Sequence, residues 1–345
     1  MFEKWFFKCR RSIKVVKRGK YKIKVMLSMA FALSGFLFVN VEKINAAIFT
    51  PDGTYVLSIG VEKNDKTLIL WEVSSGRPIR PFTGHTGWVC TVVLSPDGKY
   101  ALSGGNDESL RLWEVSTGKE IKTFWGHRNI VTDVTISPDG RYAVSTGGVL
   151  ESDPHTLKLW DLIKGEEIWT LKGRTGEFGK NVLSPDGKYI LSGGRTLKLL
   201  EGSNGKVVRT FEGNWSAYGA GGAVAFSPDG KHVFAGTSSG VSDYIIRLWE
   251  VSTGKEIRQL LGHSNFVRSI ALSHNGRYAL SGSKDKTLKL WEVATSKEIR
   301  TFHGHSGGVN SVSLSPDGKY ALSQGDDNVL KLWEVNTGKV LRTFR

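Results

Sequence analysis

The sequence predicts an all-β protein built from seven similar units, each made of four short antiparallel strands. The same residue pattern returns about every forty positions, and no helical period of usable length interrupts it. Each unit also places Gly and Pro where tight turns need them. With 345 residues, 39% of them hydrophobic, the chain is long enough to bury a substantial core without disulfides or metals.

One copy of the unit, residues 89–124, shows how each strand is recognised. Its parts are, in order, the apolar strand 89–94, the turn Ser95-Pro96-Asp97-Gly98, the strand 99–103, the strand 110–114, the turn Ser116-Thr117-Gly118-Lys119 and the strand 121–124. Each short strand alternates or is mostly apolar, which is typical of sheet strands with one buried face. Gly supplies the positive φ that such turns require, and Pro supplies a φ near −65°.

Two landmarks repeat in the same order along the whole array. The Pro-Asp-Gly turn begins at Pro51, Pro96, Pro138, Pro185, Pro228 and Pro316, and the sixth copy reads His274-Asn275-Gly276 instead. The third strand of each unit ends in an aromatic or apolar residue followed by an acid, at Trp71, Trp113, Trp160, Leu200, Trp249, Trp291 and Trp333. These landmarks number the units from one to seven.

The repeat resembles the WD-repeat family, whose units carry Gly-His near the start and Trp-Asp at the end of the third strand. Here the first pair occurs at Gly84-His85, Gly126-His127, Gly262-His263 and Gly304-His305, and the closing acid is usually Glu. The resemblance covers residues 44–345. It implies a seven-bladed β-propeller with four antiparallel strands per blade.

The resemblance also implies a structural hydrogen-bond chain within a blade, from the Gly-His histidine through a serine and an aspartate to the tryptophan. By position the chains are His85, Ser103, Asp107 and Trp113; His263, Ser281, Asp285 and Trp291; and His305, Ser323, Asp327 and Trp333. A buried imidazole between a carboxylate and a hydroxyl leaves few polar groups without a partner. Units three to five depart from this pattern, with the third unit's acid shifted to Asp153 and Leu200 in place of Trp in the fourth.

A catalytic interpretation of Ser, His and Asp is disfavoured because the same set recurs in three units, which suits a framework and not one active site. We expect no catalytic residue, no cofactor and no metal site. The expected function is a non-catalytic scaffold for protein or peptide partners. They would bind on the loop face of the propeller, the face that bears the loops between second and third strands and between one blade and the next. The alternative is a propeller enzyme or carbohydrate-binding module with a site at the central channel.

Partner binding is expected on loops held by the rigid ring. The hypothesis places an apolar and aromatic patch on the loop face, formed by Trp88, Ile130, Trp215, Tyr218 and Phe266. Each of these side chains singly is as consistent with packing between blades. The polar residues just before the loop aspartates are the other candidates, and they include Asn106, Lys284 and Asp326.

The N-terminal segment, residues 1–43, differs from the array. Residues 1–24 carry +9 of the net charge of +14, so the remaining charge favours a solvated surface over a nucleic-acid groove. Residues 25–39 contain no charge and as a helix would cover about 22 Å, less than the ~30 Å of a bilayer core. We expect an export signal or a membrane anchor that contacts the membrane through residues 25–39, and a monomeric propeller. A cytoplasmic protein with a mis-assigned start is the alternative.

Overall fold

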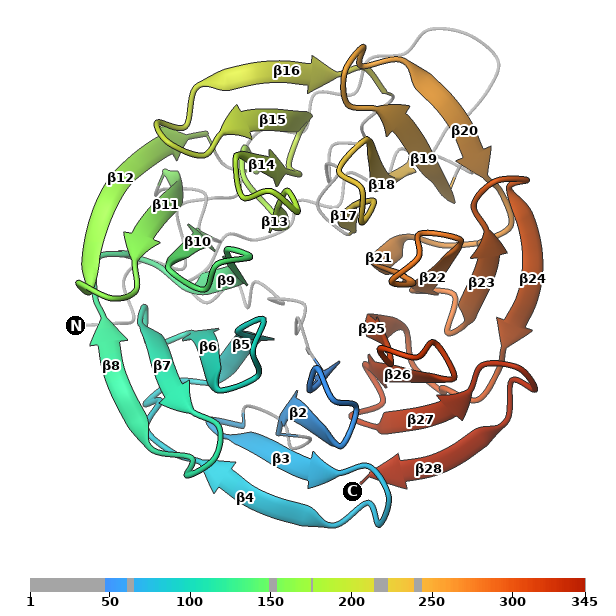
Figure 1. Ribbon diagram of the computed structural model, residues 1–345, viewed down its shortest axis with the longest axis horizontal. Helices are drawn as coiled ribbons and strands as arrows, with labels where there is room; N and C mark the ends of the chain where they lie inside the picture. The colour runs from blue at the N-terminus through green and yellow to red at the C-terminus, as the bar shows by residue number, and fades with distance from the viewer. Residues whose placement is uncertain are drawn as a thin grey trace, which may run out of the picture. The chain divides into compact units, whose positions relative to one another are not determined.

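The fold is described by a computed structural model for residues 47–60, 65–148, 154–174, 176–213, 223–238 and 244–344 (Figure 1). Within these residues the chain forms twenty-eight strands in seven four-stranded antiparallel sheets arranged as a ring (Figure 1). The prediction of an all-β, seven-bladed β-propeller is confirmed. The N-terminal segment, the predicted loop acid Asp153, and Trp215 and Tyr218 lie outside the described residues.

The strands of each blade follow one another in the chain, from the inner strand near the axis to the outer strand at the circumference (Figure 1). Blade 1 contains β1 (Ala47–Phe49), β2 (Tyr55–Ile59), β3 (Leu68–Glu72) and β4 (Pro78–Phe82); blade 2 contains β5 (Val89–Leu94), β6 (Tyr100–Gly105), β7 (Leu110–Glu114) and β8 (Glu120–Phe124); blade 3 contains β9 (Val131–Ile136), β10 (Tyr142–Gly147), β11 (His155–Asp161) and β12 (Glu166–Gly173); blade 4 contains β13 (Asn181–Leu183), β14 (Tyr189–Ser192), β15 (Leu197–Glu201) and β16 (Val207–Phe211); blade 5 contains β17 (Val224–Phe226), β18 (His232–Ser238), β19 (Tyr244–Glu250) and β20 (Glu256–Leu260); blade 6 contains β21 (Val267–Leu272), β22 (Tyr278–Ser283), β23 (Leu288–Glu292) and β24 (Lys297–Phe302); and blade 7 contains β25 (Val309–Leu314), β26 (Tyr320–Gly325), β27 (Leu330–Glu334) and β28 (Val340–Phe344).

The turn between the first two strands of a blade is built by its own side chains. In blade 2, Ser95 Oγ accepts a hydrogen bond from the backbone N–H of Tyr100 and donates to Asp97 Oδ1 at 2.6 Å. Asp97 in turn accepts from the N–H of Lys99, and Gly98 takes a φ of 70°. These bonds explain why the Ser-Pro-Asp-Gly sequence ends one strand and starts the next.

The core lies between adjacent blades, where the sheets face each other. At the seam of blades 1 and 2, Leu57, Leu70 and Phe82 of blade 1 pack with Trp113 of blade 2. The rings of Phe82 and Trp113 meet edge to face with centroids 6.0 Å apart, a favourable arrangement for an aromatic pair. The third-strand tryptophan is therefore a packing residue of the seam, which explains its recurrence in six units.

The ring closes by packing of blade 7 against blade 1, without exchange of a strand between them among the described residues. Trp71 of blade 1 and Phe344 of blade 7 form an edge-to-face pair with centroids 5.5 Å apart. The hydrogen bonds that cross the same seam include one from Gln324 Nε2 to the Ile59 carbonyl and one from the Ala47 N–H to Ser311 Oγ. Four consecutive strands complete each of these two blades, so the described chain closes its own circle.

Candidate functional site

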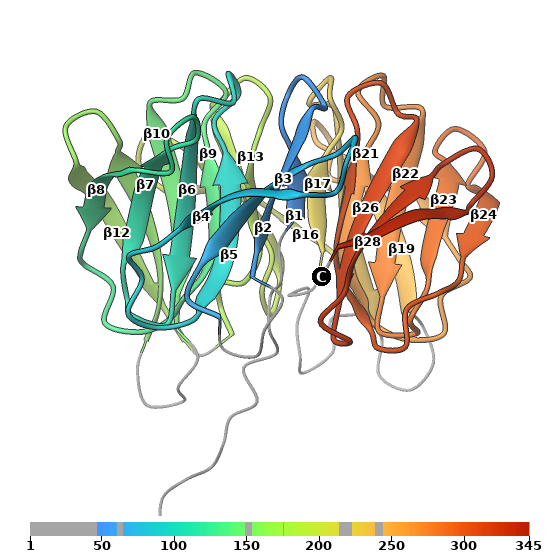
Figure 2. The ribbon, with the colours of Figure 1, turned by 90° about the horizontal axis from the view of Figure 1, so that it is seen from below.

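The propeller carries two sets of connections on opposite sides (Figure 2). We call the loop face the side that bears the loops between second and third strands and those leading from one blade to the next. We call the turn face the side that bears the turns between first and second strands and between third and fourth strands. The predicted binding residues that lie within the described ranges belong to the loop face or to the ends of strands that meet it. No helix among the described residues is long and apolar enough to cross a membrane.

A continuous hydrogen-bonded chain runs through blade 2 from the loop face to the third strand. His85 Nδ1 lies 2.9 Å from both carboxylate oxygens of Asp107, and His85 Nε2 lies 2.7 Å from Ser103 Oγ. Trp113 Nε1 donates to the same Ser103 Oγ at 2.8 Å. Because the carboxylate accepts from Nδ1–H, the hydroxyl donates to Nε2 and accepts from the indole.

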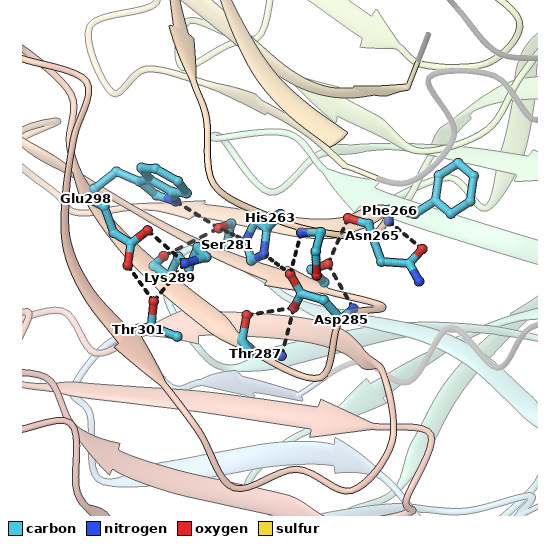
Figure 3. Close-up of polar contacts among 12 residues, drawn as sticks. His263, Asn265, Phe266, Ser281, Asp285, Thr287, Lys289, Glu298 and Thr301 are labelled. Atoms are coloured by element: carbon cyan, nitrogen blue, oxygen red, sulfur yellow. Dashed lines mark hydrogen bonds and ion pairs between the residues drawn. The ribbon is translucent and has the colours of Figure 1, made fainter. Parts of the chain in front are cut away.

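Blades 6 and 7 repeat this chain with nearly the same distances. In blade 6, His263 lies 2.7 Å from both Asp285 and Ser281, and Trp291 Nε1 donates to Ser281 at 2.9 Å (Figure 3). In blade 7 the corresponding hydrogen bonds are 2.6 to 3.0 Å long and connect His305, Ser323, Asp327 and Trp333. Figure 3 also shows the ring of Phe266 directed away from the blade 6 chain.

Burial favours the neutral form of the His305 imidazole. The side chains of His85 and His305 are fully buried, and burial lowers the pKa of His305. Burial acts to raise the pKa of the Asp327 carboxyl, but its contacts with His305 and with two backbone N–H groups lower that pKa overall. An inaccessible serine whose oxygen already accepts from an indole has no open position for a substrate, so the geometry serves as a framework.

Blades 3 and 4 lack the full chain, and the structure shows what replaces it. In blade 3, Thr156 Oγ1 stands 2.9 Å from His127 Nδ1 where the other chains have a carboxylate, while Ser145 still bonds the imidazole and Trp160. Burial and the nearby Lys158 lower the pKa of His127 to about 3. In blade 4, Ser192 Oγ is buried and has no hydrogen-bond partner.

On the loop face, a backbone hydrogen bond joins each candidate binding residue of the described ranges to a residue of the other loop of its blade. In blade 2 the Asn106 N–H donates to the Trp88 carbonyl at 2.8 Å, and in blade 6 the Lys284 N–H donates to the Phe266 carbonyl at 2.8 Å. The same bond joins Asp326 to Gly308 in blade 7, and Gly148 to Ile130 in blade 3. Each pair connects two loops of one blade, directly before its inner strand.

These residues differ in exposure. Lys284 and Asp326 are exposed, whereas Trp88, Asn106, Ile130 and Phe266 are half-buried. The Phe266 ring also contacts the Tyr244 ring of blade 5, with centroids 5.2 Å apart. The Phe266 side chain therefore packs against blade 5 and keeps part of its surface in contact with solvent.

Sequence reasoning missed a set of polar contacts that link the inner strands of neighbouring blades. Arg268 of blade 6 pairs with Asp326 of blade 7 at 2.9 Å, and Asn310 Nδ2 donates to the same carboxylate at 2.8 Å. Between blades 3 and 4, Lys180 Nζ lies 2.8 Å from the fully buried carboxylate of Asp133. The sequence gives little indication of these pairs, because no regular spacing links two opposite charges that lie about fifty residues apart.

Within the described ranges no group of three or more His, Cys, Asp or Glu side chains is placed to hold a metal ion. The buried thiol of Cys90 has its pKa raised to about 12 by burial, so it stays protonated and unreactive at neutral pH.

The chain was compared with known proteins. The family model "WD domain, G-beta repeat" matches residues 76–114, 118–161, 205–250, 254–292 and 296–334, which is more than half of the chain. The small ribosomal subunit protein RACK1 of Caenorhabditis elegans is 45% identical over 62 residues, 15% of this chain and 18% of the relative. The nuclear distribution protein PAC1 of Arthroderma otae is 33% identical over 89 residues, 26% of this chain and 18% of the relative.

Autophagy-related protein 16 of Arabidopsis thaliana is 36% identical over 89 residues, 25% of this chain and 16% of the relative. In each case the match spans less than a fifth of the relative's own length. Proteins with such repeats are typically non-catalytic interaction scaffolds. The seven blades, their buried hydrogen-bond chains and the five matched segments together show that the chain belongs to the WD-repeat family.

Proposed function

We propose that the protein is a non-catalytic scaffold that binds a protein or peptide partner on the loop face. The observation that carries this proposal is the placement of Trp88, Ile130 and Phe266 at equivalent positions before three inner strands, each half-buried and each with its backbone carbonyl hydrogen-bonded to the other loop of its blade. Rigidly held aromatic side chains that lose their remaining exposed area on binding are typical anchors of interfaces. The exposed Lys284 and Asp326 add charged groups beside them.

The state of the histidine chains supports a binding role over a catalytic one. A nucleophilic serine must reach a substrate, but Ser103, Ser281 and Ser323 are fully buried. Their hydroxyls are already committed to an imidazole and an indole. The three chains therefore contribute rigidity, and the loops they anchor are the part of the molecule that meets a partner.

A double substitution on the loop face tests this proposal. In the variant Trp88→Ala with Phe266→Ala, two anchors are lost, and each anchor is worth on the order of 2 kcal/mol in a typical interface. We expect at least a thirtyfold loss of a captured partner in a pull-down from the native cell. The matched control is Ile79→Ala with Ile299→Ala, which removes exposed aliphatic side chains from the outer strands of blades 1 and 6.

Circular dichroism and thermal melting establish that both double variants are folded before capture is compared. The control should retain the parent's partners, and the loop-face variant should lose them. If the folded loop-face variant retained every partner of the parent, the patch formed by these aromatic residues would have no role in binding.

We also propose that residues 1–43 direct export or hold the protein at a membrane. The support is the order of a cationic segment and an uncharged apolar segment, residues 1–24 and 25–39. The mass of the mature protein from its native cell tests this. A start near residue 48 indicates a cleaved signal, an intact chain in the membrane fraction indicates an anchor, and an intact soluble chain contradicts both.

A further inference from the structure

A long outer-strand side chain crosses most seams on the turn face and contacts the next blade. Five seams have a hydrogen bond from this side chain to backbone carbonyls in or beside the next blade's turn between third and fourth strands. The contacts run from Lys122 to Ile163 and Lys164, from Trp169 to Gly202, from Arg209 to Ser252 and Thr253, from Arg300 to Asn336 and Thr337, and from Arg342 to Ser74 and Ser75. At the seam of blades 1 and 2, Arg80 lies over Gly118 of the equivalent turn.

A glycine in the receiving turn makes this crossing sterically feasible. An added Cβ at Gly254 would lie 2.8 Å from Arg209 Cδ, and one at Gly338 would lie 2.8 Å from Arg300 Cδ. Real Cβ atoms essentially never approach another heavy atom so closely. A side chain at this turn position would therefore force the crossing arginine to shift away from this path.

The seam between blades 5 and 6 breaks this rule. Its receiving turn has Ser296 at the glycine position, with a φ of 60°. The arginine that should cross it, Arg258, is exposed, and no hydrogen bond or ion pair joins its side chain to the rest of the described chain. At the other seams the corresponding Arg or Lys side chains are half-buried. The Ser296 Cβ explains the difference, because it occupies the space that the arginine stem needs.

A groove of about 800 Å³ opens at this same seam. Its polar lining residues include Arg258, Arg277, His232 and His274, and one acidic residue, Asp229. Arg277 also forms an exposed ion pair with Glu292, at 3.3 Å. Its apolar lining includes the exposed side chain of Ile257 and the half-buried Val293.

The turn that borders the groove has also lost a negative charge. Six units have Pro-Asp-Gly there, but blade 6 has His274-Asn275-Gly276. The Asn275 side chain makes the same bonds as the aspartates, with Ser273 Oγ and the Arg277 N–H, so the turn keeps its shape. By contrast, the corresponding groove between blades 1 and 2 is lined by Asp52, Asp97 and Glu114 against one cation, Lys99.

We propose that the groove between blades 5 and 6 binds an extended acidic peptide segment of a partner protein. Carboxylates of the peptide would pair with the guanidinium groups of Arg258 and Arg277 and accept hydrogen bonds from the imidazoles. An apolar side chain of the peptide would cover Ile257 and Val293. This site lies on the turn face and is separate from the loop-face site proposed above.

The groove favours a peptide over a small anion for two reasons. Its volume is far larger than a phosphate or a single carboxylate requires, and its cationic groups stand on both blades beside an apolar wall. A free anion would neutralise one guanidinium and leave the apolar wall in water, whereas an acidic peptide with a leucine between glutamates covers both.

The test uses the full chain and a fluorescein-labelled nonapeptide in which glutamates flank a central leucine, followed by fluorescence anisotropy. Arg258→Glu should weaken binding at least tenfold, because it replaces an attractive charge with a repulsive one. Lys339→Glu makes the same charge change at an exposed turn residue of blade 7 and should change the affinity less than twofold. A peptide with lysines in place of the glutamates should not bind.

Ser296→Gly gives a second and opposite test of the mechanism. It removes the Cβ that blocks the crossing and favours the left-handed φ, so the protein should stay folded. Arg258 should then dock on the turn carbonyls and fill the groove, and peptide affinity should fall at least fivefold. Three results would overturn the proposal: no binding by the parent, equal binding by Arg258→Glu and the parent, or full displacement of the peptide by an equal concentration of inorganic phosphate.

Discussion

Replacing Ser103 with alanine removes the centre of the hydrogen-bond chain in blade 2. The Ser103 hydroxyl bonds His85 Nε2 at 2.7 Å and accepts from Trp113 Nε1 at 2.8 Å, and all three groups are buried. The substitution leaves an imidazole nitrogen and an indole N–H without partners. Each buried unpartnered group costs about 1–3 kcal/mol, so we expect the free energy of unfolding to fall by about 2–4 kcal/mol.

Blade 4 offers a matched control at the equivalent position. Ser192 is equally buried, but Leu200 replaces the tryptophan of this blade and the Ser192 hydroxyl has no partner. Ser192→Ala makes the same chemical change and removes an unsatisfied polar group in place of a bonded one. We expect it to be neutral or to stabilise the protein by about 1 kcal/mol.

Equilibrium urea unfolding of the parent and both variants, followed by tryptophan fluorescence and far-ultraviolet circular dichroism, measures the two effects under one condition. The expected order of midpoints is Ser192→Ala at or above the parent, and Ser103→Ala clearly below it. Equal losses in the two variants would show that removal of the hydroxyl itself, and not its bonds, sets the cost. A neutral Ser103→Ala would show that the chain contributes nothing to stability.

Three further predictions concern pH, ring closure and the N-terminal segment. The pKa of His127 is lowered to about 3 in the folded protein, so below about pH 6.5 the unfolded state binds a proton that the folded state does not, and the free energy of unfolding falls. Between pH 6.5 and 5 this fall should be about 2 kcal/mol smaller in His127→Gln than in the parent. Urea titrations that show equal falls in the two proteins would contradict this. Arg342→Ala removes the contacts with the Ser74 and Ser75 carbonyls, so hydrogen exchange of β1 and β28 should accelerate more than that of β13, while uniform exchange would argue against a local closure contact. Removal of residues 1–42 should leave a folded ring, because blades 1 and 7 are complete without that segment, and a truncated chain that forms only aggregate would show otherwise.

The sequence predicts the blades well because their determinants are local. The Ser-Pro-Asp-Gly turn is stabilised by Ser95 and Asp97, which are two residues apart, and the buried Trp113 bonds Ser103 within the same blade. The turn pair keeps the same spacing in every copy, and the serine and tryptophan are ten residues apart in blades 2, 6 and 7. A repeat of forty residues therefore reveals both the strands and the framework that supports them.

Contacts between blades are less visible in the sequence. Arg209 bonds the carbonyls of Ser252 and Thr253, and backbone carbonyls carry no residue identity that could reveal the partner. In blade 3, Thr156 takes the place of the loop aspartate as the partner of the histidine. The loop of this blade has a different length, so the partner cannot be found by counting residues from the histidine as in blades 2, 6 and 7. One signal was present: a serine, Ser296, stands where other copies of the turn have glycine, and it lies at the seam with the groove of about 800 Å³.

Site-specific photo-cross-linking in the native cell asks whether a partner binds at the loop face. A photoreactive phenylalanine analogue is placed at Trp88 on the loop face, and at Ile299 on the outer strand β24 as the control. We expect a discrete adduct from position 88 that is lost with Phe266→Ala, and no adduct from position 299. A discrete adduct from position 299 with none from position 88 would contradict it.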